Sequence, residues 1–182
     1  DGKALRRALA AGQSAPVLVS AWARENGLVL GQLQVRDKSN EITAVPELLR
    51  ALELAGCIVT LDAMGCQKNI AKEIKEADAE YVLALKGNHA LVHEEVQSYL
   101  DDAIARGAKE LVRHETVEKD HGRLETRTYW QSAELGWFAD RAQWEGLQSV
   151  GVVEARRQVG DGPATVERRY YLSSLGPDAA RF

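Results

Sequence analysis

The segment "CIVTLDAMGCQ" at residues 57–67 constrains the fold more than any other part of the sequence. Its first five residues, Cys57 to Leu61, are apolar and rich in β-branched side chains, which predicts a short strand buried on both faces of a sheet. Asp62 follows where that strand would emerge, and a helical pattern begins at Gln67. A strand followed directly by a helix is typical of an α/β sheet, with Asp62 at one edge.

The neighbouring segments continue this alternation. Residues 15–35 predict a hairpin, because Asn26-Gly27 is a strong turn signal between two apolar runs. Residues 40–54 predict a helix with Pro46 early in it and Gly56 as its stop. Further along the chain the pattern predicts a helix over 67–77, a strand over 79–88 and a helix over 89–107 that is closed by Gly107.

Beyond residue 110 the chain favours strands. We therefore expect an α/β part over residues 1–109 and a β-rich segment over 110–175 that completes the core or is inserted into it. A length of 182 residues suits one domain with a substantial core. The predicted class is α/β, with a mixed sheet, flanking helices and a β-rich C-terminal segment.

Bulk composition narrows the range of partners. A formal net charge of -4 gives no general attraction to nucleic acid, so any such binding requires local basic patches. No apolar run reaches the roughly 18 residues that a membrane span requires. The spacing of Cys57 and Cys66 suits neither a zinc cluster nor a disulfide framework, which indicates reduced thiols of a cytosolic protein. Because the sequence begins at Asp1 without a methionine, we expect a piece of a longer protein.

Two carboxylates are candidates for one metal site. If a central strand preceded Asp1 and lay beside the strand that ends at Asp62, both side chains would project from the same sheet edge. Paired carboxylates bind divalent metals through hard oxygen ligands, as two-metal phosphoryl transfer requires. The alternatives remain open at this point, since Asp62 also suits a helix cap and Asp1 an ordinary exposed terminus.

Several basic residues are candidates for such local patches. In "LKGNH" (85–89), Lys86 and Asn88 follow a predicted strand, where Lys86 could contact a phosphate or be a solvated turn lysine. Strand alternation in "DHGRLETR" (120–127) puts Arg123, Glu125 and Arg127 on one face, as an ion-pair ladder or a DNA contact.

Two arginine pairs occur in the β-rich segment. The pairs Arg156-Arg157 and Arg168-Arg169 are either solvated or together form a phosphate-binding strip.

Several long motifs resemble one protein family. The motifs are "DGK.LR", "LVSAWARENGLVLGQ.QV..KSNEITAVPELLRALEL.GCIVTLDAMGCQ", "YVLALKGN", "HGRLETR" and "YYLSSL". Together they resemble the insertion-sequence transposases of the ISAs and H-repeat type, which belong to the DDE superfamily and have a ribonuclease H-like catalytic core. The resemblance runs from Asp1 to about Leu175 and so covers nearly the whole chain.

The resemblance implies specific roles. It makes Asp1 and Asp62 the first two catalytic, metal-binding acids, which would hold Mg²⁺ or Mn²⁺ together with a glutamate. It implies in-line attack of water or a DNA 3′-hydroxyl on a phosphodiester during transposition. DNA-binding residues are then expected to be Lys86, Asn88, His121, Arg123, Arg127, Arg156 and Arg168.

The resemblance also implies a missing part. The third acid of the family lies on a helix beyond the "YYLSSL" strand, and we expect it after Phe182, because the surroundings of Asp178 do not match it. The 182 residues alone would then be inactive. The expected partners are transposon ends and target DNA in the bacterial cytoplasm, at the nucleoid during action, with a homodimer as one form of the active complex and no membrane.

Two other functions remain as alternatives. One is a non-catalytic DNA-binding or assembly remnant of a decayed transposase, and the other is a different ribonuclease H-like nuclease.

Overall fold

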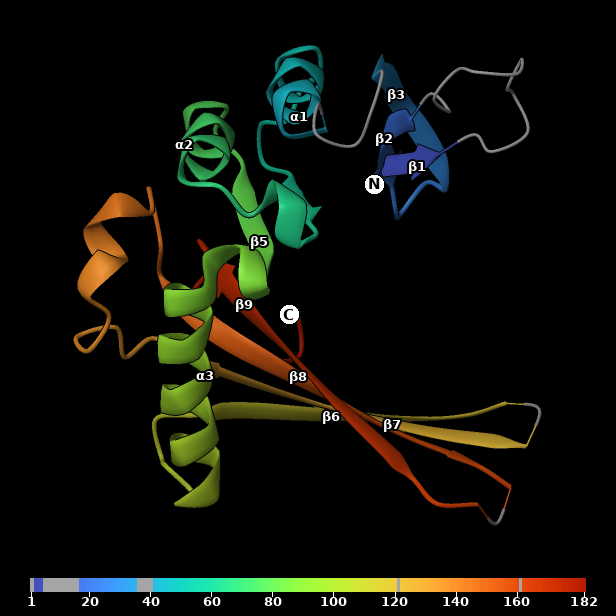
Figure 1. Cartoon of the computed structure of the whole chain (residues 1–182), viewed down its shortest axis with the longest axis vertical. Helices are drawn as coiled ribbons and strands as arrows, with labels where there is room; N and C mark the ends of the chain where they lie inside the picture. The colour runs from blue at the N-terminus through green and yellow to red at the C-terminus, as the bar shows by residue number, and fades with distance from the viewer. Residues whose placement is uncertain (1, 5–16, 36–40, 121, 161) are drawn as a thin grey trace. The chain divides into compact units, whose positions relative to one another are not determined.

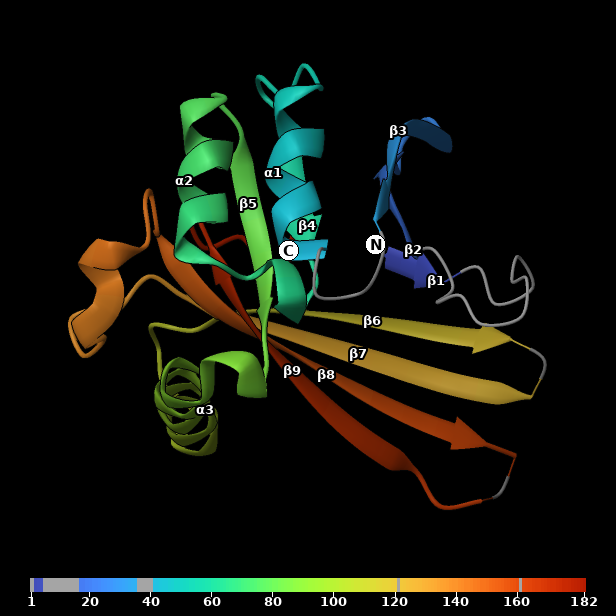
Figure 2. The same cartoon turned by 45° about the horizontal axis from the view of Figure 1, so that its top comes forward.

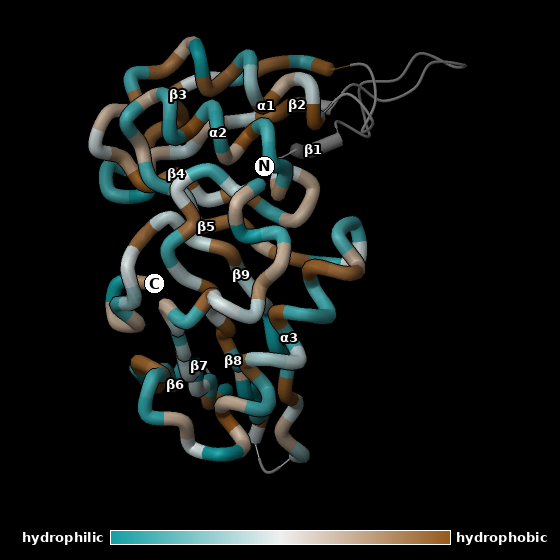
Figure 3. The backbone as a smooth tube through the Cα atoms, turned by 90° about the vertical axis from the view of Figure 1, so that its left-hand side faces the viewer, coloured by the Kyte–Doolittle hydropathy of each residue, from teal (hydrophilic) through white to brown (hydrophobic). Residues whose placement is uncertain are grey.

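The computed structural model describes residues 2–4, 17–35, 41–120, 122–160 and 162–182 (Figure 1). The chain divides into two units, Asp1–Tyr81 and Val82–Phe182. Helices and strands occur in both units, so the predicted α/β class is confirmed. Hydrophobic and hydrophilic stretches follow one another closely along the chain (Figure 3), and none of the described helices is long and apolar enough to cross a membrane.

The first unit begins with a small antiparallel sheet. Its strands are β1 (Gly2–Ala4), β2 (Val17–Ala23) and β3 (Leu28–Val35), in the order β1-β2-β3. The predicted turn between β2 and β3 is confirmed, and Gly27 takes a φ of +63°, which glycine adopts without the steric cost of a β-carbon. The pairing of β2 with β3 shifts between Ala21 and Trp22, as at a β-bulge.

Helix α1 (Glu41–Arg50) packs against this sheet. Val19 of β2 and Leu48 of α1 share a buried cluster, and a β-carbon on Gly31 would stand 3.0 Å from the Leu48 side chain. The helix ends at Arg50, so the prediction that it continues to residue 54 with Gly56 as its stop is wrong. Gly56 instead belongs to a turn, where its N–H donates a hydrogen bond of 3.0 Å to the Asp78 carbonyl.

The predicted strand before Asp62 is confirmed, but its predicted burial is wrong. Strand β4 (Ile58–Leu61) alternates between exposed and partly buried residues, and Ile58 is 37% exposed. The reason is its position among the described strands, because there β4 is the end strand of the sheet β4-β5-β9-β8-β7-β6, with β5 as its neighbour. The 3-10 helix η2 (Ala63–Gly65), helix α2 (Lys68–Glu76) and strand β5 (Glu80–Leu85) follow it.

The second unit contains the predicted β-rich segment. After the 3-10 helix η3 (Gly87–His89) and helix α3 (Ala90–Ala105) come β6 (Val112–Asp120), β7 (Arg123–Ser132), the 3-10 helix η4 (Ala139–Gln143), β8 (Ser149–Val159) and β9 (Thr165–Ser173). Consecutive strands from β6 to β9 are antiparallel, and β9 also pairs with β5. The mixed six-stranded sheet is compatible with a ribonuclease H-like fold.

The two faces of the strands β6–β9 differ. The face that carries Trp130, Val152 and Tyr170 packs against α3, and we call it the helix face. The opposite face carries Arg127, Arg157 and Arg169, and we call it the arginine face. Figure 2 shows that both hairpins, β6-β7 and β8-β9, extend well beyond α3.

Candidate functional site

Asp62 stands directly after β4 and caps η2. Its Oδ1 accepts hydrogen bonds from the backbone N–H groups of Met64, at 3.2 Å, and Gly65, at 3.4 Å. The helix-cap alternative therefore describes the local geometry correctly. Asp62 is exposed, and both of these bonds go to Oδ1 and not to Oδ2. A cap that occupies one carboxylate oxygen leaves the other suited to a cation.

The expected partner of Asp62 cannot be located, because Asp1 lies outside the described residues. The shared site of Asp1 and Asp62 therefore remains a prediction. Among the residues that are described, no three His, Cys, Asp or Glu side chains form a group that could hold a metal ion. By itself, the Asp62 carboxylate supplies one hard oxygen ligand of the kind that Mg²⁺ and Mn²⁺ prefer.

The two cysteines flanking Asp62 are both free thiols. Cys57 is exposed, whereas Cys66 is buried, and burial raises the pKa of the Cys66 thiol to about 12. Because a metal ligand or nucleophile must be the thiolate, Cys66 is a packing residue at this position.

Lys86 and Asn88 are exposed at the end of β5, as predicted. Lys86 lies at the start of η3, and Asn88 lies within it. The hydrogen bond and charge of Arg169 lower the pKa of Glu167, and the charge of Lys86 adds to this effect. Lys86 is therefore electrostatically coupled to β9.

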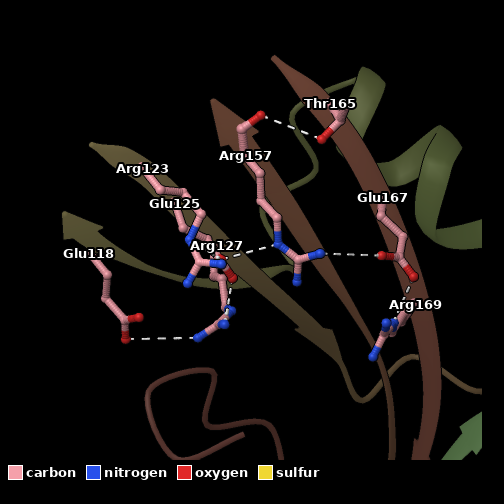
Figure 4. A network of polar contacts seen from close by, with 8 residues as sticks. All are labelled: Glu118, Arg123, Glu125, Arg127, Arg157, Thr165, Glu167 and Arg169. Carbon is pink, nitrogen blue, oxygen red and sulfur yellow. Dashed lines mark hydrogen bonds and ion pairs between the residues drawn. The ribbon is translucent and has the colours of Figure 1, made fainter. Parts of the chain in front are cut away.

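A buried acid organises the arginine face. Glu125 of β7 contacts arginines on two strands (Figure 4): its Oε1 is 2.5 Å from Arg127 Nη2, and its Oε2 is 3.1 Å from Arg157 Nε. Arg123 Nε is 3.9 Å from the same Oε2. The Glu125 side chain is only 5% exposed, and the hydrogen bond from Arg157 holds its pKa below the ordinary value despite burial.

Outer residues extend this network across four strands (Figure 4). Arg127 is 3.8 Å from Glu118 of β6, and Arg157 is 4.0 Å from Glu167 of β9, which binds Arg169 at 2.9 Å. The ion-pair ladder expected from strand alternation is thus confirmed. The network holds four arginines and three glutamates, so its formal charge is +1 in a chain whose net charge is -4.

The arginine pairs do not form one strip. Adjacent strand residues point to opposite faces, so Arg156 and Arg168 lie on the helix face while Arg157 and Arg169 lie on the arginine face. Arg168 bridges Asp101 of α3, at 2.8 Å, and Glu154 of β8, at 2.7 Å. Two close carboxylates make Arg168 a link between helix and sheet.

His121 lies outside the described residues, so its expected role in DNA binding remains a prediction. Sequence reasoning did not identify Arg169 and Glu118 as members of the same network. Alternation along each strand was the signal in the sequence that could have assigned each of these residues to a face. It does not give the register between neighbouring strands, which determines that these residues lie close together.

Comparison with known proteins gives three related results. The family described as Transposase DDE domain matches residues 17–179. "Uncharacterized protein in dhlA 3'region" of Xanthobacter autotrophicus is 41% identical over 180 residues, which cover 98% of this chain and 60% of that protein. "Putative transposase YncI" of Escherichia coli O157:H7 is 41% identical over 187 residues, covering 100% of this chain and 48% of that protein.

A third relative belongs to the H-repeat group. "H repeat-associated putative transposase YhhI" of Escherichia coli strain K12 is 34% identical over 195 residues, covering 100% of this chain and 50% of that protein. The chain thus spans about half to three fifths of the length of these relatives.

Proposed function

This chain belongs to the DDE-domain transposase family of the H-repeat type, and from that premise we propose that it is the catalytic-core part of a DNA transposase. The proposed reaction is metal-dependent phosphodiester hydrolysis and strand transfer during transposition of an insertion sequence. The observation that carries the proposal is Asp62, an exposed acid directly after β4 within the family match.

We assign the metal site to Asp62, Asp1 and an acid after Phe182. Asp62 fits this role because its two cap bonds share Oδ1, which leaves Oδ2 for a cation. When bound at such a site, divalent metal activates the attacking oxygen as a nucleophile and stabilises the charge on the leaving oxygen. The cap of η2 fixes the orientation of the Asp62 carboxylate, so binding the ion requires little rearrangement of this side chain.

The proposed partners are the transposon ends and target DNA, with a homodimer as one form of the active complex. Lys86, Arg123 and Arg127 suit contacts with phosphates, because the chain as a whole is negative and these cations are exposed or partly exposed. Asn88, His121 and Arg156 remain candidates, whereas we assign Arg168 to structure. We place this activity in the bacterial cytoplasm, at the nucleoid.

A cleavage assay tests the proposal. The protein completed to the length of its relatives should nick a plasmid that carries the ends of its element, in the presence of Mn²⁺. Asp62→Asn should abolish nicking. Asp78→Asn is the matched control, because Asp78 is an exposed acid whose positive φ of 53° suits asparagine.

Two outcomes would contradict the proposal. Full nicking by Asp62→Asn would exclude Asp62 from the site. A completed protein that binds DNA but never cleaves it would favour the alternative, a non-catalytic remnant. We also propose that residues 1–182 alone bind Mn²⁺ weakly and do not cleave DNA, because they lack the third acid.

A further inference from the structure

Glu125 is an unusual residue for its position. It is the third residue of strand β7, its side chain is 5% exposed, and it is charged. A buried ion pair adds little stability compared with a well-packed apolar residue of the same size, because both charges lose their hydration. Stability alone therefore does not explain an acid here, and its arginine partners are the features to examine.

The two oxygens of Glu125 hold arginines from different strands. Oε1 contacts Arg127 of β7 and Oε2 contacts Arg157 of β8, so one carboxylate keeps two like charges side by side. Each guanidinium carries five N–H donors in one plane. One carboxylate oxygen accepts hydrogen bonds from only some of these donors, so the others can bind another anion. The Arg127 and Arg157 side chains are 36% and 42% exposed, so solvent reaches them.

The outer acids of the network differ from Glu125. Glu118 and Glu167 are 66% and 51% exposed, and they lie 3.8 and 4.0 Å from Arg127 and Arg157. Exposed pairs at such distances contribute little free energy, so an incoming anion can replace them. Glu125 is buried beneath the arginines and remains in place. The network thus combines one fixed acid with two replaceable ones.

We infer that Glu125 is a positioning residue that holds Arg127 and Arg157 together as a binding site for the phosphates of a DNA backbone. This inference rests on the proposed function, since DNA is the substrate proposed there. The local formal charge of +1 in a chain of -4 favours a polyanion at this face. Planar guanidinium groups favour phosphate because they can donate two parallel hydrogen bonds.

The inference makes the sign of one mutational effect informative. Removing an acid from a DNA-binding surface ordinarily strengthens binding, because the surface becomes more positive. Glu118→Gln should therefore leave affinity unchanged or raise it. Glu125→Gln removes the same charge, but it also removes the group that holds the two arginines, so it should weaken binding.

The experiment measures fluorescence anisotropy of a labelled duplex of arbitrary sequence at low salt, with residues 1–182 as wild type, Glu125→Gln and Glu118→Gln. We expect Glu125→Gln to lower affinity about three- to tenfold, as expected for loss of a charge-assisted contact. It should also reduce the salt dependence by about one phosphate contact. Circular dichroism checks that each variant is folded.

A second variant covers the case in which Glu125→Gln does not fold. Arg157→Lys keeps the positive charge but loses the planar guanidinium that can donate two parallel hydrogen bonds. It should therefore also weaken DNA binding about threefold or more. Glu125→Gln binding as tightly as Glu118→Gln, unchanged affinity of Arg157→Lys, or no DNA binding by the wild type would each overturn the inference. None of these outcomes depends on Asp62, whose metal binding and cleavage test the proposed function separately.

Discussion

The ring of Phe182 lies against Gly151, so closely that a β-carbon added to Gly151 would stand 2.6 Å from the ring atom Cζ. The ring also packs edge-on against Tyr171, with centroids 5.4 Å apart. Nearby, the Asp178 N–H donates a hydrogen bond of 2.7 Å to Oε1 of the buried Gln131. The segment after β9 is therefore fixed on the second unit by both packing and a buried hydrogen bond.

Gly151→Ala should displace the Phe182 ring. We expect the free energy of unfolding to fall by about 1–3 kcal/mol, the usual cost of overpacking. Urea denaturation measures this change. Gly176→Ala is the control, because a β-carbon there would meet only Gln148 Oε1 at 3.8 Å. Equal stability of Gly151→Ala and wild type would show that the ring moves aside freely.

Two substitutions at Asp62 should separate its cap from its metal ligand. Asp62→Asn keeps a good helix-cap residue, so we expect stability close to wild type together with loss of Mn²⁺ binding. Asp62→Ala should lose metal binding and also about 1 kcal/mol of stability. Calorimetric titration and urea denaturation measure the two effects. Metal binding retained by Asp62→Asn would remove Asp62 from the proposed site.

The stability contributed by Glu125 should depend on pH. Because the hydrogen bond from Arg157 lowers its pKa in the folded state, the contribution is complete above the ordinary glutamate pKa of about 4.3. It is lost as the pH falls below that value and through the lower folded pKa. Glu125→Gln should therefore show a shallower loss of stability on acidification than wild type. Parallel acid-unfolding curves would contradict this.

Replacing Arg156 and Arg157 one at a time should separate the two sheet faces. We expect Arg157→Gln to weaken DNA binding for all duplex sequences, because phosphate contacts carry no base readout. Arg156→Gln, on the helix face, should change affinity much less. Anisotropy titrations over a range of salt concentrations test the difference. A larger loss of affinity for Arg156→Gln than for Arg157→Gln would indicate that DNA binds to the helix face instead.

The two cysteines should react at very different rates. Cys57 is exposed and should react with a thiol reagent in the native protein at pH 8. Cys66 is buried with a pKa of about 12 and should react only after unfolding. Cys57→Ser should therefore give almost no native-state labelling, as absorbance of the released thiolate would show. Rapid labelling of that variant would indicate frequent opening around η2.

Local signals in the sequence were sufficient for most elements. Asn26-Gly27 identified the β2-β3 turn, and apolar periodicity ended by Gly107 identified α3. The position of β4 at the end of the sheet, as the described strands form it, could not be inferred in this way, because an apolar run does not reveal how many neighbours a strand has. Burial was therefore overestimated there.

The candidate site was less accessible to sequence reasoning. Alternation correctly placed Arg123, Glu125 and Arg127 on one face. The link to Arg157 depends on the pairing of β7 with β8, which brings Arg157 beside Glu125, 32 residues away in the sequence. For Asp62, the pattern left capping and metal binding as alternatives. The geometry makes them compatible, since both cap bonds use one oxygen.

The order of the strands also affects folding during synthesis. β5 is made before α3 and the β6-β7 hairpin, yet its partner β9 leaves the ribosome only after all of these elements and β8. The β6-β7 hairpin has local contacts and can form early, whereas the β5-β9 pairing must await a distant segment. A nascent chain therefore carries β5 without β9 while α3 and the strands β6 to β8 are made. During this interval, binding by a chaperone would prevent β5 from pairing with other chains.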